Sequence, residues 1–155
     1  MVVVIATPNE LELVKKLGYE NEPIIITGVG GVNVIRALKH LPKDTEIINI
    51  GYAGSNKLPV GEIVDIGWVS TNHEKAKFKE LYGLPKEDFE SPRKSVGCYT
   101  STDFVTETKR NTPCVFDMEL AFICAMFDNV RAIKVVSDNL NLKEYEKNVE
   151  KKDAD

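Results

Sequence analysis

Short apolar runs separated by glycine, proline and asparagine recur along the chain. Strands are expected at residues 2–5, 23–27 and 46–50, which are rich in the β-branched residues typical of buried strands. Helical patterns follow the first two runs, at residues 10–17 and 34–38. Strands that alternate with helices predict an α/β fold, here a three-layer, mostly parallel mixed sheet with helices on both faces.

The second half of the chain continues this pattern after a charged interruption. We expect strands at residues 61–69 and 96–100. Residues 71–96 are charged and lack apolar periodicity, so they are interpreted as a surface excursion within a single domain, residues 1–155. Three further segments are expected to be a small-residue loop, a helical turn and a charged helix, in this order: residues 51–55, 106–110 and 142–152.

The most informative stretch is residues 115–127, where a short apolar strand continues directly into an apolar helix. Asp117 and Glu119 lie at the join, where the free N–H groups and positive dipole end of the helix favour a carboxylate. The next strand, residues 130–136, is followed by Asp138. Carboxylates beyond the carboxyl ends of neighbouring strands are typical of ligand sites in open α/β sheets.

The composition excludes several function classes. The chain has 155 residues, 43% of them hydrophobic and 28% charged, as in one soluble globular domain. A net charge of −4 without a lysine and arginine stripe argues against a nucleic-acid surface. The longest apolar runs, such as residues 120–127, are too short to cross a bilayer. Three cysteines without metal-type spacing indicate reduced thiols in a cytoplasmic protein, and two isolated histidines give no reason to propose a metal site.

A glycine-rich turn at residues 28–31 could present backbone N–H groups to an anion or a sugar. A dinucleotide fingerprint would require glycine where Asn33 stands, and an acid about twenty residues later, where Ile48 and Asn49 stand. NAD binding is therefore not expected. The structural alternative is a tight turn between a strand and a helix.

Each carboxylate also has a purely structural interpretation. Asp138 could form a turn after a strand, and Glu119 and Glu10 could be acids in the first turn of a helix. The set favours a site, because all three carboxylates and the glycine turn follow the carboxyl ends of predicted strands.

Five segments, in the same order, resemble the nucleoside phosphorylase and methylthioadenosine/adenosylhomocysteine nucleosidase superfamily. The resemblance implies a nucleoside phosphorylase-like fold, a small-molecule nucleoside as ligand, and a homo-oligomer, with a dimer favoured. The segments are residues 5–10, 28–33, 49–54 with 60–64, 117–119 and 137–138.

The resemblance also implies roles for single residues. Asp138 matches the general acid that neutralises the departing base near N7, and Glu119 matches the carboxylate that binds the ribose hydroxyls. Glu10 matches the acid that activates water in the nucleosidases. The other substrate-binding residues would be Met118 on the sugar face, Phe104 stacked on the base, the backbone of Val105 at the base edge, and Ser137 and Gly54.

Core packing remains the alternative for Met118 and Phe104. Phosphorolysis would require cationic groups around phosphate, yet residues 6–10 contain an acid and no arginine, and Tyr52 stands where the family often has serine or threonine. Water is therefore the favoured nucleophile.

We expect a cytoplasmic hydrolase of adenosine-type purine nucleosides that needs no metal or organic cofactor. The alternatives are a purine nucleoside phosphorylase and a non-catalytic nucleoside-binding or scaffold domain.

Overall fold

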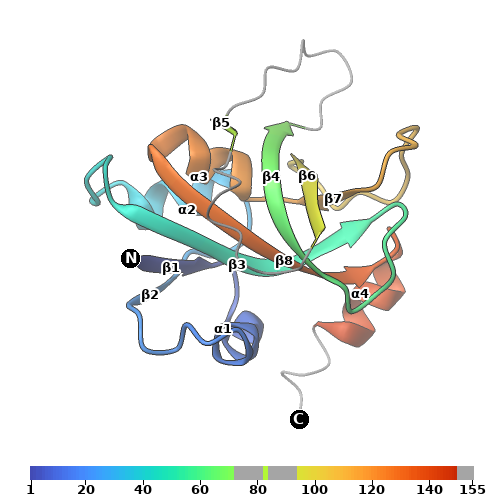
Figure 1. Ribbon diagram of the computed structural model, residues 1–155, viewed down its shortest axis with the longest axis horizontal. Coiled ribbons are helices and arrows are strands. Elements are labelled where there is room, and N and C mark those ends of the chain that lie inside the picture. Colours follow the sequence, from blue (N-terminus) through green and yellow to red (C-terminus); the bar gives the residue numbers. More distant parts are fainter. Residues whose placement is uncertain (72–81, 84–93, 150–155) are drawn as a thin grey trace.

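The computed structural model describes residues 1–71, 82–83 and 94–149 (Figure 1). Most of the surface excursion expected at residues 71–96 therefore lies outside the described residues. The described strands form a mixed sheet, as predicted. They are β1 (Val2–Ile5), β2 (Ile24–Ile26), β3 (Glu46–Ser55), β4 (Ile63–Thr71), β5 (Tyr82–Gly83), β6 (Lys94–Thr100), β7 (Cys114–Asp117) and β8 (Asn129–Asp138).

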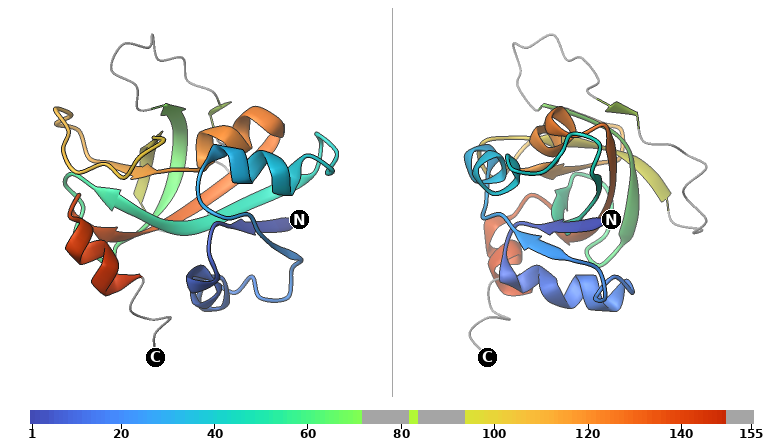
Figure 2. Two further views of the ribbon diagram at one scale, coloured as in Figure 1. Left: turned by 180° about the vertical axis from the view of Figure 1, so that it is seen from behind. Right: turned by 90° about the vertical axis from the view of Figure 1, so that its left-hand side faces the viewer.

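The sheet closes on itself, which the alternation of strands and helices did not predict. Strand β3 pairs in parallel with β1 and β8, and in antiparallel with β7. Strand β8 pairs with β4, β4 with β6, and β6 with β7, so these pairings lead from β3 back to β3. The views in Figures 1 and 2 show the resulting strong curvature. A simple three-layer stack is therefore not confirmed.

The closure depends on the length of β3. Strand β1 occupies one edge of β3 as far as Asn49, and β7 takes the same edge at Gly54 and Ser55. The expected loop at residues 51–55 is thus wrong: these small residues continue the strand, because β8 and β7 both pair with it.

Helices pack against both faces of the β1–β3–β8 part of the sheet. On one face, Val3 and Ile5 of β1 share an apolar cluster with Leu13 of α1. On the other, Val4 clusters with Val34 of α2 and with residues of α3, as alternation along a strand requires. The helices are the 3-10 helix η1 (Pro8–Glu10), α1 (Leu11–Lys16), α2 (Gly31–Leu38), α3 (Leu120–Met126) and α4 (Leu142–Asn148).

Two other expectations need correction. Residues 106–110 form no helical turn, and the charged helix begins at Leu142 as predicted but ends at Asn148. Residues 150–152 of the expected helix lie outside the described residues. None of the described helices is long and apolar enough to span a membrane.

Candidate active site

Three carboxyl ends of strands meet at Gly54. This residue pairs with Phe116 of β7 and, across an irregularity in the register, with Asp138 of β8. Strands β3 and β7 are antiparallel but overlap near their carboxyl ends, so the segment after β7 arrives beside the end of β8. The segment after β1 adds Glu10, whose carboxylate contacts the backbone of β3 at Tyr52. Acids from three distant segments are thereby brought together.

A cavity of about 290 Å³ lies at this junction. It is lined by Glu10, Glu119 and Asp138 together. Four more of the predicted site residues line the same cavity: Met118, Phe104, Ser137 and Gly54. Val105 does not, and lines instead a neighbouring hollow of about 30 Å³ that shares Phe104, Met118 and Asp138 with the main cavity.

Asp138 ends strand β8 and is fully buried. Its Oδ1 accepts a hydrogen bond from the Ser137 hydroxyl at 2.7 Å, and its Oδ2 accepts one from the Leu140 N–H at 3.0 Å. Burial raises the pKa of Asp138, while the hydrogen bonds from Ser137 and from the backbone of Leu140 and Asn141 oppose the rise. The approach also requires glycine at position 54, because a Cβ there would lie 2.9 Å from the Asp138 Oδ2.

Glu119 lies between β7 and α3, and its Oε2 accepts a hydrogen bond from the Gly30 N–H at 2.8 Å. Gly30 has a φ of 89°, a conformation that glycine adopts without strain. The glycine turn thus supplies a backbone donor, and its acceptor in this structure is a carboxylate of the chain and not an anion or sugar ligand. Burial first and the charge of Asp117 second raise the pKa of Glu119 to about 7, and Lys134 and the Gly30 bond oppose the rise.

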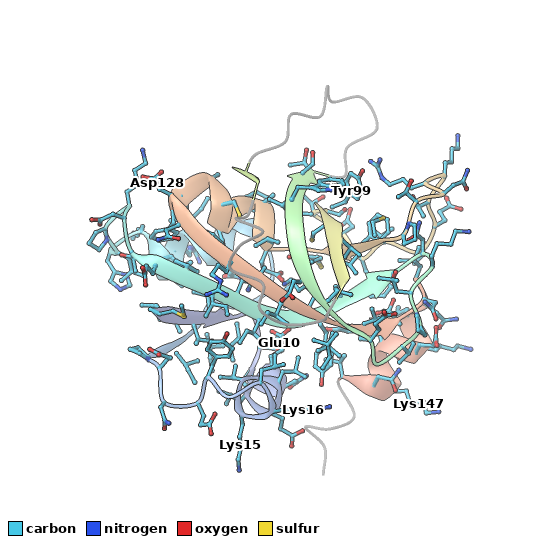
Figure 3. The ribbon with its side chains drawn as sticks, viewed as in Figure 1. Glu10, Lys15, Lys16, Tyr99, Asp128 and Lys147 are labelled. Carbon is cyan, nitrogen blue, oxygen red and sulfur yellow. The ribbon has the colours of Figure 1, made fainter. Side chains whose placement is uncertain are left out.

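Glu10 turns back over the end of β1. Its Oε1 accepts from the N–H groups of Ala6 and Thr7, at 2.9 and 3.2 Å, and its Oε2 accepts from the N–H of Tyr52 at 2.8 Å. In Figure 3 Glu10 lies inside the molecule, whereas Lys15 and Lys16 of the adjacent α1 point outward. Burial raises the pKa of Glu10, and the charge of Lys134 and these three N–H groups oppose the rise.

Sequence reasoning missed an ion pair behind the cavity wall. The Nζ of Lys134 lies 3.3 Å from Oδ2 of Asp117, and both side chains are buried. Asp117 also accepts a hydrogen bond from the Thr100 hydroxyl at 2.6 Å. A charged residue within the apolar run 130–136 was the signal that could have found Lys134, because a buried lysine requires a partner.

It also missed an apolar wall formed by α4 and by Val149, which directly follows this helix. Leu142, Tyr145 and Val149 line the cavity, at the spacing that places residues on one helical face. The ring of Tyr145 lies 5.3 Å from that of Phe104, centroid to centroid. The charged residues between these positions hide the spacing in the sequence.

Among the residues that the structure describes, no group of three or more His, Cys, Asp or Glu side chains is placed to hold a metal ion.

No family sequence model and no curated protein sequence matches the chain. Several solved structures are similar to the chain. The 5′-methylthioadenosine/S-adenosylhomocysteine nucleosidase of Neisseria meningitidis, in complex with methylthio-immucillin-A, has a TM-score of 0.72 and 16% identity, over 96% of this chain and 90% of that one. The S-adenosylhomocysteine nucleosidase of Streptococcus pyogenes, in complex with 5-methylthiotubericidin, has a TM-score of 0.73 and 16% identity, over 96% of this chain and 88% of that one.

A third similar structure is the futalosine hydrolase of Helicobacter pylori, with a TM-score of 0.69 and 15% identity over 97% of this chain and 90% of that one. At these identities the likeness concerns the fold. The fold predicted from the resemblance is confirmed in this respect: the chain is folded like the 5′-methylthioadenosine/S-adenosylhomocysteine nucleosidases.

Proposed function

We propose that this protein, as a single domain of residues 1–155, hydrolyses the N-glycosidic bond of an adenosine-type purine nucleoside. The observation that carries the proposal is the convergence of Glu10, Glu119 and Asp138 on one cavity of about 290 Å³. The nucleoside analogues bound to the similar nucleosidases support a nucleoside as the ligand.

Asp138 is the general acid. Cleavage of the bond leaves negative charge on the base, and a proton delivered near N7 neutralises it. A raised pKa increases the fraction of Asp138 that carries this proton near neutral pH. The Ser137 hydroxyl donates to Oδ1 and the Leu140 N–H donates to Oδ2, and these two bonds hold the carboxyl group in place at the cavity.

Glu119 and Glu10 act on the sugar side. Glu119 accepts hydrogen bonds from the ribose hydroxyls and stabilises the positive charge that develops on the ring in the transition state. Glu10 activates the attacking water, and its raised pKa makes it a stronger base. The other roles are Met118 on the sugar face, Phe104 stacked on the base, the backbone of Val105 at the base edge, and Ser137 and Gly54 as further contacts.

The charges around the cavity support water over phosphate as the nucleophile. Glu10, Asp117, Glu119 and Asp138 all line it, and no lysine or arginine is among the described residues that do. A phosphate dianion would meet repulsion there without the cationic donors that phosphate sites use.

The test is to incubate the protein with adenosine-type nucleosides and to measure free base by chromatography, with and without phosphate. We expect phosphate-independent release, and a decrease in kcat of about 10²- to 10⁴-fold for Asp138→Asn. Asp128→Asn is the matched control and should retain full activity, because Asp128 is exposed and directly precedes the start of β8, the strand that Asp138 ends (Figure 3).

The other outcomes select the alternatives. Base release that requires phosphate would identify a phosphorylase. Saturable nucleoside binding by calorimetry without turnover would identify a non-catalytic binding domain. Equal inertness of the wild type and Asp138→Asn across a broad nucleoside panel would contradict the enzymatic proposal.

We further propose that the enzyme is a cytoplasmic homodimer. Cys98, Cys114 and Cys124 are free and buried, which supports a reducing compartment. Exposed apolar side chains at the start of α2, among them Val32, lie next to Val29, which lines the cavity, and support an interface there.

A further inference from the structure

Lys134 is a fully buried lysine that does not line the cavity, although it lies next to three acids that do. Its side chain is on β8, and its Nζ is 2.6 Å from Oδ1 of Asn49 and 3.3 Å from Oδ2 of Asp117. Gly51 lies between Lys134 and Glu10: a Cβ built there would be 3.3 Å from the Lys134 Nζ and 2.5 Å from the Glu10 Oε2. The ammonium group is therefore enclosed by β3, β7 and β8.

Four ionisable groups face this ammonium from the elements packed around it. They are Asp117 of β7, Cys98 of β6, Glu119 at the start of α3 and Glu10 of η1. Burial alone would lower the pKa of Lys134, but these acids, Asp117 first, raise it overall. One positive charge thus faces three carboxyl groups, so the cluster holds more acids than it can neutralise.

The carboxyl groups are not equally stabilised. Asp117 accepts from the Thr100 hydroxyl at 2.6 Å, from the Leu120 N–H at 2.8 Å and from the Cys98 thiol at 3.3 Å, in addition to its ion pair. Glu10 accepts three backbone N–H groups. For the Glu119 carboxylate the structure gives one hydrogen bond from within the described chain, that from Gly30. The backbone N–H of Glu119 donates at 3.4 Å to Oδ2 of Asp117, the same oxygen that pairs with Lys134, so Glu119 adjoins the ion pair directly.

We propose that Lys134 and Asp117 are positioning residues that act with opposite sign on Glu119 and together set the charge that Glu119 presents to the ribose. The inference rests on the proposed function, because it specifies how the ribose-binding carboxylate is controlled. Neither residue has to touch the substrate to do so: Lys134 lies behind the wall, and Asp117 is held by donors of the chain.

The two charges have opposite effects on proton affinity. A positive neighbour favours the ionised form of a carboxyl group, and a negative neighbour favours the neutral form. Removing the charge of Lys134 therefore raises the pKa of Glu119, and removing that of Asp117 lowers it. A role limited to packing would produce no such opposition, since loss of either partner would then only loosen the structure.

The experiment measures the titration of Glu119 directly, by NMR of the ¹³C-labelled carboxyl carbons of glutamate, with Glu119→Gln to assign the signal. In the wild type we expect a midpoint at about 7. Lys134→Met should move the midpoint up by about 1 pH unit and Asp117→Asn should move it down by about as much. The double variant should lie between the two single variants.

A midpoint that stays in place in both single variants, or that moves in the same direction in both, would overturn the inference. Thermal unfolding and amide spectra establish that each variant is folded. Lys134→Gln is the second neutral variant, because its amide can still donate to Asn49 and Asp117. The Asp117→Asn variant alone is also decisive, because an unmoved or raised midpoint of Glu119 in this variant contradicts the inference.

The titration requires no turnover, so its failure is distinguishable from failure of the proposed hydrolysis. If the protein proves inactive on every nucleoside while the midpoints shift in opposite directions, the electrostatic inference holds and the proposed function does not. If the protein is active, the acid limb of the pH profile of kcat/KM should follow the NMR midpoints in each variant, whereas a packing defect would lower kcat at every pH.

Discussion

The protein around Glu119 stabilises the ionised form of this side chain only weakly. Its carboxyl group is largely withdrawn from water, faces Asp117 and accepts one hydrogen bond from Gly30. These conditions favour the neutral acid in the folded protein, although the proposed chemistry uses the carboxylate. Ligand binding would supply the missing donors, because ribose hydroxyls can donate to a carboxylate.

The consequence is a stability that depends on pH. The pKa of Glu119 rises from 4.5 to about 7, so between these values the folded state binds more protons than the unfolded state. The contribution of Glu119 is therefore most favourable below pH 4.5 and is lost as the pH rises through about 7. We expect Glu119→Gln to raise the Tm relative to the wild type more at pH 8 than at pH 5, because glutamine cannot ionise.

Thermal unfolding followed by circular dichroism at the two pH values checks this prediction. Glu20→Gln, at an exposed glutamate, is the control and should change Tm equally at both. An equal shift at both pH values for Glu119→Gln would show that Glu119 is not destabilised by ionisation.

Strand β3 has glycine at two positions where a side chain would displace a carboxylate of the site. Gly51 leaves room for the Glu10 carboxylate and Gly54 leaves room for that of Asp138. We predict that Gly51→Ala folds but displaces Glu10, because the new Cβ would lie 2.5 Å from Oε2. Base release should decrease by about 10²-fold or more, as expected when a general base is moved.

The readout is kcat for Gly51→Ala, for Glu10→Gln and for the two combined. If the alanine acts through Glu10, the double variant should be no slower than the slower single variant. Multiplied losses would mean that Gly51→Ala damages the site by another route.

The elements that the sequence predicted well are those that bury both faces. The strand and helix within residues 115–127 form β7 and α3, with Asp117 and Glu119 at the join, because most of the apolar side chains there pack in one core cluster or against it. The carboxylates found on this unit, after β1 and at the end of β8 could therefore be predicted as a set. Their placement required only the order of the elements and the position of each strand end.

The errors have a common physical origin in pairing between distant segments. Nothing local in the small residues at 51–55 favours a strand, and they become one because β7 and β8 hydrogen-bond to them. The polar residues at 106–110 have no apolar face to bury, so a helical turn there gains nothing from packing. The partners of Lys134 come from β3 and β7, which no local pattern can reveal.

For the whole molecule, the apolar surface at the start of α2 predicts self-association. Val29, Val32 and Ile35 are 44%, 69% and 48% exposed, and Val29 lines the cavity. We expect Val32→Asp to shift the protein from dimer to monomer, because a buried unpaired carboxylate at an interface is costly. Analytical ultracentrifugation measures the change.

Val60→Asp is the control, since Val60 is 41% exposed but lies outside this surface, and it should leave the mass unchanged. A wild-type protein that sediments as a monomer at high concentration would contradict the proposed homodimer.

The short pairing of β3 with β7 has a kinetic consequence. It consists of Gly54 with Phe116 and Ser55 with Val115, which are distant along the chain, and Gly54 and Phe116 also line the cavity. Contacts between distant segments form late, because the intervening chain must first lose conformational entropy. After dilution from denaturant, helical content should therefore recover before nucleoside cleavage does. A folding intermediate in which β3 and β7 have not yet paired would be nearly native in shape yet catalytically inactive.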